Sequence, residues 1–292
     1  MKRFISTVIL LIFVIIASSF LLDSIYTKLH HTKTPRSKAS YLLQNKVAGY
    51  DYIFLGSSRV HNHINPEIIY EKTGKRAINL GVQGAKLNDY ELFLEIISEN
   101  NIEFERIFVQ VDYVFNHFNF NDVSGVDVIP FMNSSKAVEN HLKKYNESYS
   151  IYKSVPFYRY MKNDFAIGFR ESLMLLSERK SKVDFSNGFD PKHIRGVDMA
   201  TSLPSKIVKE NPIFNRIDSI ASLHSINITY FTAPFCLNTK NIKYIDSLES
   251  KIPGLRDYSR SILDDKYFYN CSHLNIDGAN LFTEIIIENL QL

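Results

Sequence analysis

Two serines and an arginine directly follow a short apolar run near the start of this chain. The run at 52–55 stops at Gly56, and the next three residues are Ser57, Ser58 and Arg59. In α/β proteins, ligands and chemistry lie just beyond the carboxyl ends of parallel strands, so a strand ending here would present a hydroxyl nucleophile. Taken by itself, the stretch is more commonly a Gly-Ser turn between a strand and a helix. A catalytic role for one of these serines therefore depends on a base and oxyanion donors from other parts of the chain.

A serine nucleophile needs a base within hydrogen-bond reach, a group that orients the base, and donors for the oxyanion. His273 is a candidate base because it lies in the loop that enters a predicted terminal helix at 279–290. Gly81 ends the second predicted strand. Each has an ordinary explanation as well: Ser58 as a turn cap, Gly81 as a positive-φ residue, and His273 as a loop hydrogen-bonding group. For serine chemistry the chain therefore offers an early serine after the first strand and a late histidine before the last helix.

Strand and helix patterns alternate around these residues, which predicts a parallel sheet covered by helices. Three strands and two helices alternate within 51–112, and the pattern resumes within 211–292, where 228–232 reads as a strand. The intervening residues, about 116–205, are rich in Tyr, Phe, Lys and Asn and predict a mainly helical insertion over the active edge of the sheet. We therefore expect one α/β domain at 46–292 that carries this insertion.

The N-terminus predicts a membrane-spanning helix. Phe4 to Leu22 contains no charged residue, and about 20 apolar residues are needed to cross a bilayer. A helix in the core of a soluble protein is rarely apolar on all sides. A cleaved signal peptide is the alternative, because 17–19 has small residues of the cleavage type. The length of the run favours an uncleaved anchor at 1–22, followed by a polar stalk at 23–45.

Charge indicates the location and the class of partner. Lys2 and Arg3 favour an N-terminus inside the cell, so the predicted domain is extracytoplasmic and the protein a single-pass protein of the cell membrane. Lys and Arg number 34 against 31 Asp and Glu. This near balance argues against a nucleic-acid-binding surface.

The cysteines predict neither a metal site nor a disulfide framework. The chain has only Cys236 and Cys271, and Cys-x-x-Cys and His-x-x-x-His spacings are missing from its sequence. Two buried free thiols are expected, with a single bridge as the alternative in an oxidising compartment. No Gly-x-Gly-x-x-Gly or Gly-Lys-Ser/Thr loop follows the first strand, which argues against nucleotide binding. We expect no metal and no cofactor.

Three motifs together resemble the SGNH (GDSL-like) hydrolase superfamily. They are Leu-Gly-Ser-Ser at 55–58, Asn-Leu-Gly-Val-Gln-Gly at 79–84, and Asn-Cys-Ser-His-Leu-Asn-Ile-Asp-Gly-Ala at 270–279. With the N-terminal anchor, the resemblance is to the membrane-anchored branch near the surface-polysaccharide O-acetylation and DltD-like proteins. It covers roughly 51–112 and 211–292. It implies a three-layer α/β/α, flavodoxin-like fold around the parallel sheet.

The resemblance also implies roles for individual residues. Ser58 matches the nucleophile, since it is the second residue after the glycine, and Ser57 is then a turn residue. His273 matches the base, and the N–H groups of Ser58 and Gly81 match the oxyanion donors. Asn270 stands where the superfamily has its acid. An asparagine can orient His273 but cannot stabilise an imidazolium as a carboxylate does, so Asp264 or Asp265 is an alternative acid, and an impaired site is a further alternative.

A second departure follows the third predicted strand. Where many members have Gly-x-Asn-Asp, this chain has Asp112-Tyr-Val-Phe, so the usual oxyanion asparagine is missing and Asn116 is only a weak candidate. Arg59, Gln83 and Asp112 follow the predicted strand ends and are candidates for substrate binding. Arg59 is more often a solvated or ion-paired side chain than a substrate clamp.

The resemblance implies an extracytoplasmic serine esterase or O-acyltransferase that acts on an ester of a cell-surface glycan. Its implied partners are the membrane, an acylated glycan or other ester substrate, and a membrane acyltransferase. The alternative is a non-catalytic SGNH-like protein that binds glycan or a membrane partner, an idea that Asn270 and the missing oxyanion asparagine support.

Overall fold

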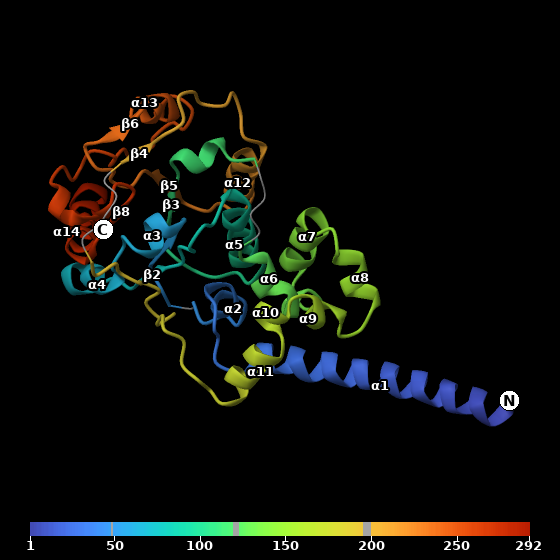
Figure 1. Ribbon diagram of the computed structural model, residues 1–292. Helices are drawn as coiled ribbons and strands as arrows, with labels where there is room; N and C mark the ends of the chain where they lie inside the picture. The colour runs from blue at the N-terminus through green and yellow to red at the C-terminus, as the bar shows by residue number, and fades with distance from the viewer. Residues whose placement is uncertain (48, 119–122, 195–199) are drawn as a thin grey trace. The chain divides into compact units, whose positions relative to one another are not determined.

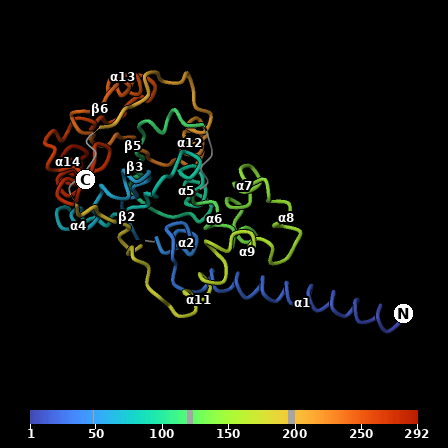
Figure 2. The backbone as a smooth tube through the Cα atoms, in the orientation of Figure 1, coloured from blue at the N-terminus to red at the C-terminus, as the bar shows by residue number. Residues whose placement is uncertain are grey.

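The computed structural model describes residues 1–47, 49–118, 123–194 and 200–292. The chain forms two compact units, shown in Figures 1 and 2, and each is described by itself. The helical unit comprises Met1–Gln44 and Gly125–Ser181, and the α/β unit comprises Asn45–Ser124 and Lys182–Leu292. The insertion predicted at 116–205 is thus shared between the units, because only its middle groups with the N-terminal helix.

A four-stranded parallel sheet in the order β2-β1-β3-β5 is the centre of the α/β unit. Its strands are β1 (Tyr52–Leu55), β2 (Ala77–Asn79), β3 (Arg106–Gln110) and β5 (Ile228–Phe231). The first three are apolar runs that are buried almost throughout, as strands covered on both faces require. The predicted mixed α/β class with a parallel sheet is confirmed.

Helices cover the sheet in two pairs. α4 (Pro66–Thr73) packs with α14 (Ile276–Leu290), and α5 (Leu87–Glu99) packs with α12 (Pro212–Leu223). In Figure 1 the sheet lies between the two pairs. Along the sheet, β2 lies on one side of β1 and β3 lies on the other side, so the chain moves in opposite directions from β1 to β2 and from β2 to β3. Because such crossovers are right-handed, this reversal places α4 and α5 on opposite faces.

Shorter elements complete the α/β unit around the carboxyl ends of the strands. They are α3 (Ser58–His61), η1 (Tyr113–Asn116), α13 (Tyr244–Glu249), η3 (Asp265–Tyr267), the parallel pair β4 (Thr201–Ser202) and β6 (Thr239–Lys240), and the antiparallel pair β7 (Phe268–Asn270) and β8 (His273–Leu274).

Cys236 and Cys271 form a disulfide, with their Cα atoms 4.7 Å apart. The expectation of two free thiols is therefore wrong. The fold brings together the loop after β5 and the turn between β7 and β8, and the Cys236 N–H donates a hydrogen bond to the Cys271 carbonyl (3.1 Å). The bridge ties the segment that carries Asn270 and His273 to the end of β5.

The helical unit begins with α1 (Lys2–Thr32), a helix that is long and apolar enough to cross a membrane. The residues predicted as a polar stalk, 23–45, begin inside α1, which continues to Thr32 without a break, and 23–44 belong to the helical unit. Polar groups of this extension pair within the unit: Arg159 Nη2 donates to Asp23 Oδ1 (2.6 Å), and His30 Nε2 lies 3.3 Å from the Ile167 carbonyl.

Eight further short helices of this unit follow α1 in the described residues. They are α2 (Lys38–Leu43), α6 (Gly125–Val128), η2 (Ile129–Phe131), α7 (Lys136–Tyr145), α8 (Tyr149–Ser154), α9 (Tyr158–Lys162), α10 (Asp164–Ile167) and α11 (Phe169–Leu176). α10 and α11 are separated at Gly168, where an added Cβ would collide with the Asp164 side chain. Asp164 Oδ1 instead accepts the N–H of Phe169, the first residue of α11 (2.8 Å).

Candidate active site

Ser58 is the first residue of α3, directly beyond the carboxyl end of β1. Ser57 holds this turn: its Oγ accepts the Arg59 N–H (3.3 Å) and donates to Gln110 Oε1 at the end of β3 (2.9 Å). The Ser57 N–H also donates to Gln110 Oε1 (3.2 Å). Ser57 is thus committed to structure, and Ser58, with 8% of its surface exposed, is left to face the histidine.

The structure brings Ser58, His273 and Asn270 into one hydrogen-bonded chain. Ser58 Oγ lies 2.7 Å from His273 Nε2, and His273 Nδ1 lies 3.0 Å from Asn270 Oδ1. The Ser272 N–H also donates to Asn270 Oδ1 (3.0 Å), which fixes the amide with its oxygen toward the ring. His273 Nδ1 must therefore carry the proton, so Nε2 has the lone pair that accepts the Ser58 hydroxyl.

His273 is held in its neutral form. Burial, together with the positive charges of Arg59 and Lys192, lowers the pKa of His273 to about 4. Asp264 and Asp265, the alternative acids, are exposed at the start of η3, where Asp264 accepts the Lys266 N–H (2.9 Å). Among these candidates, the structure places only Asn270 against the imidazole.

The low pKa of His273 predicts an unusual pH dependence. Modification of Ser58 by a fluorophosphonate requires neutral His273, so we expect the rate to be full at pH 6 and to reach half its maximum near pH 4. Because the folded pKa lies below the unfolded value of about 6.5, this group also stabilises the fold less as pH falls from about 6.5 to about 4. Labelling rates measured across pH, with circular dichroism as a folding control, test this. A midpoint near 6.5 in folded protein would contradict it.

Of the two backbone N–H groups expected as oxyanion donors, the Gly81 N–H already has an acceptor. Within the described residues, the Ser58 N–H at the start of α3 has no acceptor. The Gly81 N–H, however, donates to Asn79 Oδ1 (3.0 Å), whose amide nitrogen also donates to the Val60 carbonyl (2.7 Å). An added Cβ on Gly81 would lie 2.4 Å from the backbone nitrogen of His61. Gly81 is thus required for close approach of the backbone to α3, and its N–H already has an acceptor.

Arg59 and Asp112 form a buried ion pair beneath the site. Arg59 is 0% and Asp112 1% exposed, and Arg59 Nε lies 2.6 Å from Asp112 Oδ2. The guanidinium also donates to the carbonyls of Ser272 and Ala233 and lies 3.6 Å from the centre of the Phe235 ring. Burial raises the pKa of the Asp112 carboxyl, and Arg59 opposes that increase. The structure does not bring either side chain to a surface where substrate could bind.

Gln83, the third candidate for substrate binding, is exposed and donates to Asn62 Oδ1 (2.9 Å). It therefore lies at the carboxyl end of α3 rather than against Ser58 or His273. Asn116, the weak candidate for an oxyanion donor, has other partners: its side chain donates to the Lys206 carbonyl and accepts from the Tyr244 hydroxyl.

Comparison with known proteins does not assign this chain to a family. No protein-family model matches it, and no curated protein matches it. A solved structure described as "a putative platelet activating factor from Streptococcus pneumonia" shares 14% identity with it, covering 98% of this chain and 99% of that chain. Its TM-score is 0.39, which is too low to support a conclusion about fold or function.

Two residues near the site were not found from the sequence. His63 is completely buried, its Nε2 accepts the Leu274 N–H (3.1 Å), and its ring centre lies 5.9 Å from that of His273. Burial lowers the pKa of His63 well below its usual range. The Lys192 carbonyl accepts the Ile276 N–H (2.8 Å). No local pattern in the sequence indicates either contact, because each joins segments far apart in the chain.

Nowhere in the described ranges do three or more His, Cys, Asp or Glu side chains gather in a way that could hold a metal ion. The chemistry that the arrangement supports is acyl transfer through a serine, since it combines a hydroxyl, a neutral imidazole in the right tautomer and a backbone N–H donor.

Proposed function

We propose that this protein is a membrane-anchored, extracytoplasmic serine esterase or O-acyltransferase of the SGNH type, acting on an ester of a cell-surface glycan. The single observation that carries the proposal is the 2.7 Å contact between Ser58 Oγ and His273 Nε2, with Asn270 holding the other ring nitrogen. The strand order β2-β1-β3-β5, with Ser58 after β1 beside β3, supports it, since such sheets bind ligands where the strand order reverses.

In the proposed mechanism, Ser58 Oγ attacks the acyl carbonyl carbon while its proton moves to His273 Nε2. The Ser58 N–H stabilises the resulting oxyanion. The ester oxygen of the substrate then takes the proton from His273 and leaves as an alcohol, which gives an acyl-Ser58 intermediate. Water resolves this intermediate in an esterase, and a sugar hydroxyl does so in an acyltransferase. His273 takes the proton of the second nucleophile in either case.

Two observations support the extracytoplasmic location. α1 is apolar over 4–22 and is preceded by Lys2 and Arg3, a charge distribution that favours an N-terminus inside the cell. The Cys236–Cys271 disulfide is of a kind that persists in oxidising compartments and is rare in the cytosol. The glycan substrate is inferred from the resemblance in sequence motifs.

Covalent labelling with a fluorophosphonate tests the nucleophile. We expect the full-length protein to be phosphonylated at Ser58 Oγ with loss of fluoride, and Ser58→Ala to lose labelling by at least about 10³-fold. Ser57→Ala is the matched control: it removes a turn cap and costs stability of about 0.5–2 kcal/mol, but it should still label. Mass spectrometry of the labelled peptide identifies the modified serine. Wild-type protein that stays inert, or labelling that persists in Ser58→Ala, would refute the nucleophile.

The second candidate function is binding of glycan or a membrane partner without catalysis. The observation that favours it is Asn270, which orients His273 but cannot stabilise its charged form. The low pKa of His273 points the same way, because protonation of this imidazole during catalysis is costly here. Substitution of Asn270 distinguishes the two functions.

A further inference from the structure

The helical unit exposes many large apolar side chains outside α1. Seven lie in Gly125–Ser181, whereas the described residues of the α/β unit, which is more than three times as long, carry six. Five of the seven follow one another on α9–α11: Met161, Phe165, Phe169, Leu173 and Leu176, each 48–81% exposed. Single exposed apolar residues are ordinary, but a group of this kind marks an interaction surface.

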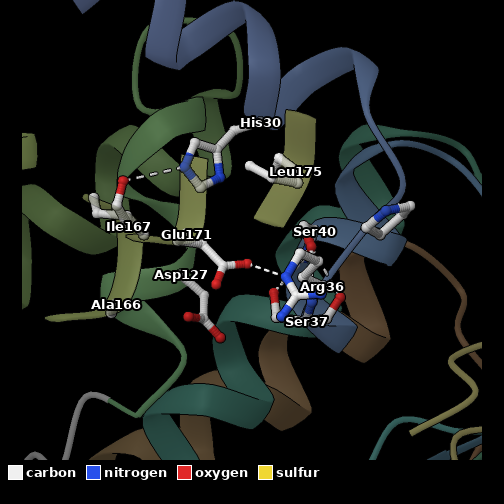
Figure 3. Close-up of a pocket in the computed structure, with 10 residues that line it drawn as sticks. His30, Arg36, Ser37, Ser40, Asp127, Ala166, Ile167, Glu171 and Leu175 are labelled. Atoms are coloured by element: carbon white, nitrogen blue, oxygen red, sulfur yellow. Dashed lines mark hydrogen bonds and ion pairs between the residues drawn. The ribbon is translucent and has the colours of Figure 1, made fainter. Parts of the chain in front are cut away.

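α11 turns its apolar side outward. Glu171 and Leu175 are four residues apart and therefore share one face, and Figure 3 shows both beside a cavity where Glu171 pairs with Arg36. Phe169 and Leu173, also four residues apart, fall on the opposite face together with the nearby Leu176. In a soluble protein this outward face would be expected to be polar.

The same helices pack around the end of α1 that follows its apolar run. Tyr26 of α1 packs against Tyr160 of α9 with ring centres 5.2 Å apart and ring planes inclined by 60°, and α1 also packs against α11. Figure 1 shows α9, α10 and α11 gathered near this end of α1. Tyr26 lies four residues, or about 6 Å, beyond Leu22. The headgroup layer of a bilayer is about 5–8 Å thick on each side, so a bilayer that α1 crosses with residues 4–22 would have its headgroup layer at the level of these helices.

The exposed charges around this surface are mostly basic. Lys162 and Arg170 are exposed beside Phe165 and Phe169, as are Arg179 and Lys180 after α11. The carboxylates of Glu171 and Glu178 are paired with basic residues just after α1, and Asp164 is the exposed acid of α10. Such a surface complements anionic lipid headgroups.

We propose that α9–α11 lie on the membrane that α1 crosses, with Phe165, Phe169 and Leu173 entering the headgroup layer and Lys162 and Arg170 contacting lipid phosphates. This inference rests on the membrane anchoring in the proposed function. Such an apolar face typically enters about 5–10 Å into the headgroup and acyl boundary. The helical unit is then a second, surface-bound attachment to the bilayer.

Tryptophan fluorescence tests this directly, because the chain contains no Trp. The full-length protein is reconstituted into vesicles of phosphatidylcholine and phosphatidylglycerol with brominated acyl chains. Each variant carries one probe: Phe169→Trp on α11, Phe20→Trp on the exposed side of α1, or Leu223→Trp, which replaces a residue 78% exposed on α12. We expect bromine to quench Phe169→Trp at least about twofold more than Leu223→Trp, and less than Phe20→Trp. In Phe169→Trp/Arg170→Gln, quenching should fall in these anionic vesicles.

The other possible outcomes each refute either the surface attachment or the anchor. If Phe169→Trp is quenched no more than Leu223→Trp while Phe20→Trp is quenched, the surface attachment is refuted and the anchor stands. Emission that shifts to shorter wavelength without quenching, and more so at high protein-to-lipid ratio, would assign the surface to a second copy or another protein instead. If Phe20→Trp is not quenched, the anchor itself is refuted. Labelling of Ser58 in the same vesicles reports the catalytic proposal separately.

Discussion

Asn270→Asp is expected to raise the rate of ester hydrolysis through Ser58 by about 10²- to 10⁴-fold. A carboxylate beside His273 Nδ1 would stabilise the imidazolium that forms when Ser58 attacks, which the amide oxygen now at 3.0 Å does only weakly. It would also raise the pKa of His273 by about 1–3 units. The acid limb of the rate should therefore move upward from about pH 4. Hydrolysis of a chromogenic acetate ester, measured across pH, gives both values.

Ser58→Ala/Asn270→Asp is the control for this gain. If the double variant keeps the increased rate, the new carboxylate acts independently of Ser58 and the proposed role of Asn270 is wrong. A wild-type protein without activity, combined with an active Asn270→Asp variant, would favour the non-catalytic function with a decayed site. A wild-type activity that Asn270→Asp leaves unchanged would mean that an asparagine suffices in this site.

Arg59→Met is expected to lower the free energy of unfolding of the α/β unit by about 3–5 kcal/mol. The substitution would leave Asp112, which is 1% exposed, as an unpaired buried charge. It would also remove the donors that hold the carbonyls of Ser272 and Ala233. Hydrogen exchange followed by mass spectrometry on β1 and β3 measures this change within one unit, so that separate unfolding of the helical unit does not obscure it.

Two further variants test whether the loss of stability comes from the buried Arg59–Asp112 ion pair. Lys72 and Glu284 form an exposed ion pair at 2.9 Å, so Lys72→Met should lower stability far less than Arg59→Met does. Arg59→Met/Asp112→Leu should recover part of the loss, because both charges are then absent. A loss in Arg59→Met no larger than that in Lys72→Met would show that the buried pair contributes little.

Much of the fold was predictable because its signals are local. The strands are short and rich in apolar residues, and the bounds predicted for β1 (52–55) and β5 (228–232) agree with the structure within one residue at each end. Asn65 and Pro66 mark the start of α4, and Asn65 Oδ1 accepts the Glu67 N–H as an N-cap does (3.1 Å). Periodicity and capping depend on residues a few positions apart, so they can be recognised directly in the sequence.

What the sequence did not predict are contacts between distant segments. Residues 23–32 were predicted as stalk because they are polar, but Asp23 has a buried partner in Arg159, 136 residues away. The two cysteines were predicted as free thiols because spacing alone does not show that the loop after β5 meets the β7–β8 turn. Neither contact has a local signature.

The same division holds for the site. By itself, the sequence determined that Ser58 follows a strand, that His273 lies shortly before the last helix, and that Asn270 stands three residues before His273. Only the tertiary structure decided that Ser58 Oγ and His273 Nε2, 215 residues apart, lie at 2.7 Å. It also decided that Arg59 neutralises Asp112 in the core and that the Gly81 N–H is already bonded to Asn79. The physical reason is that burial and partners, which set the charge and free donors of a side chain, depend on which segments the fold brings together.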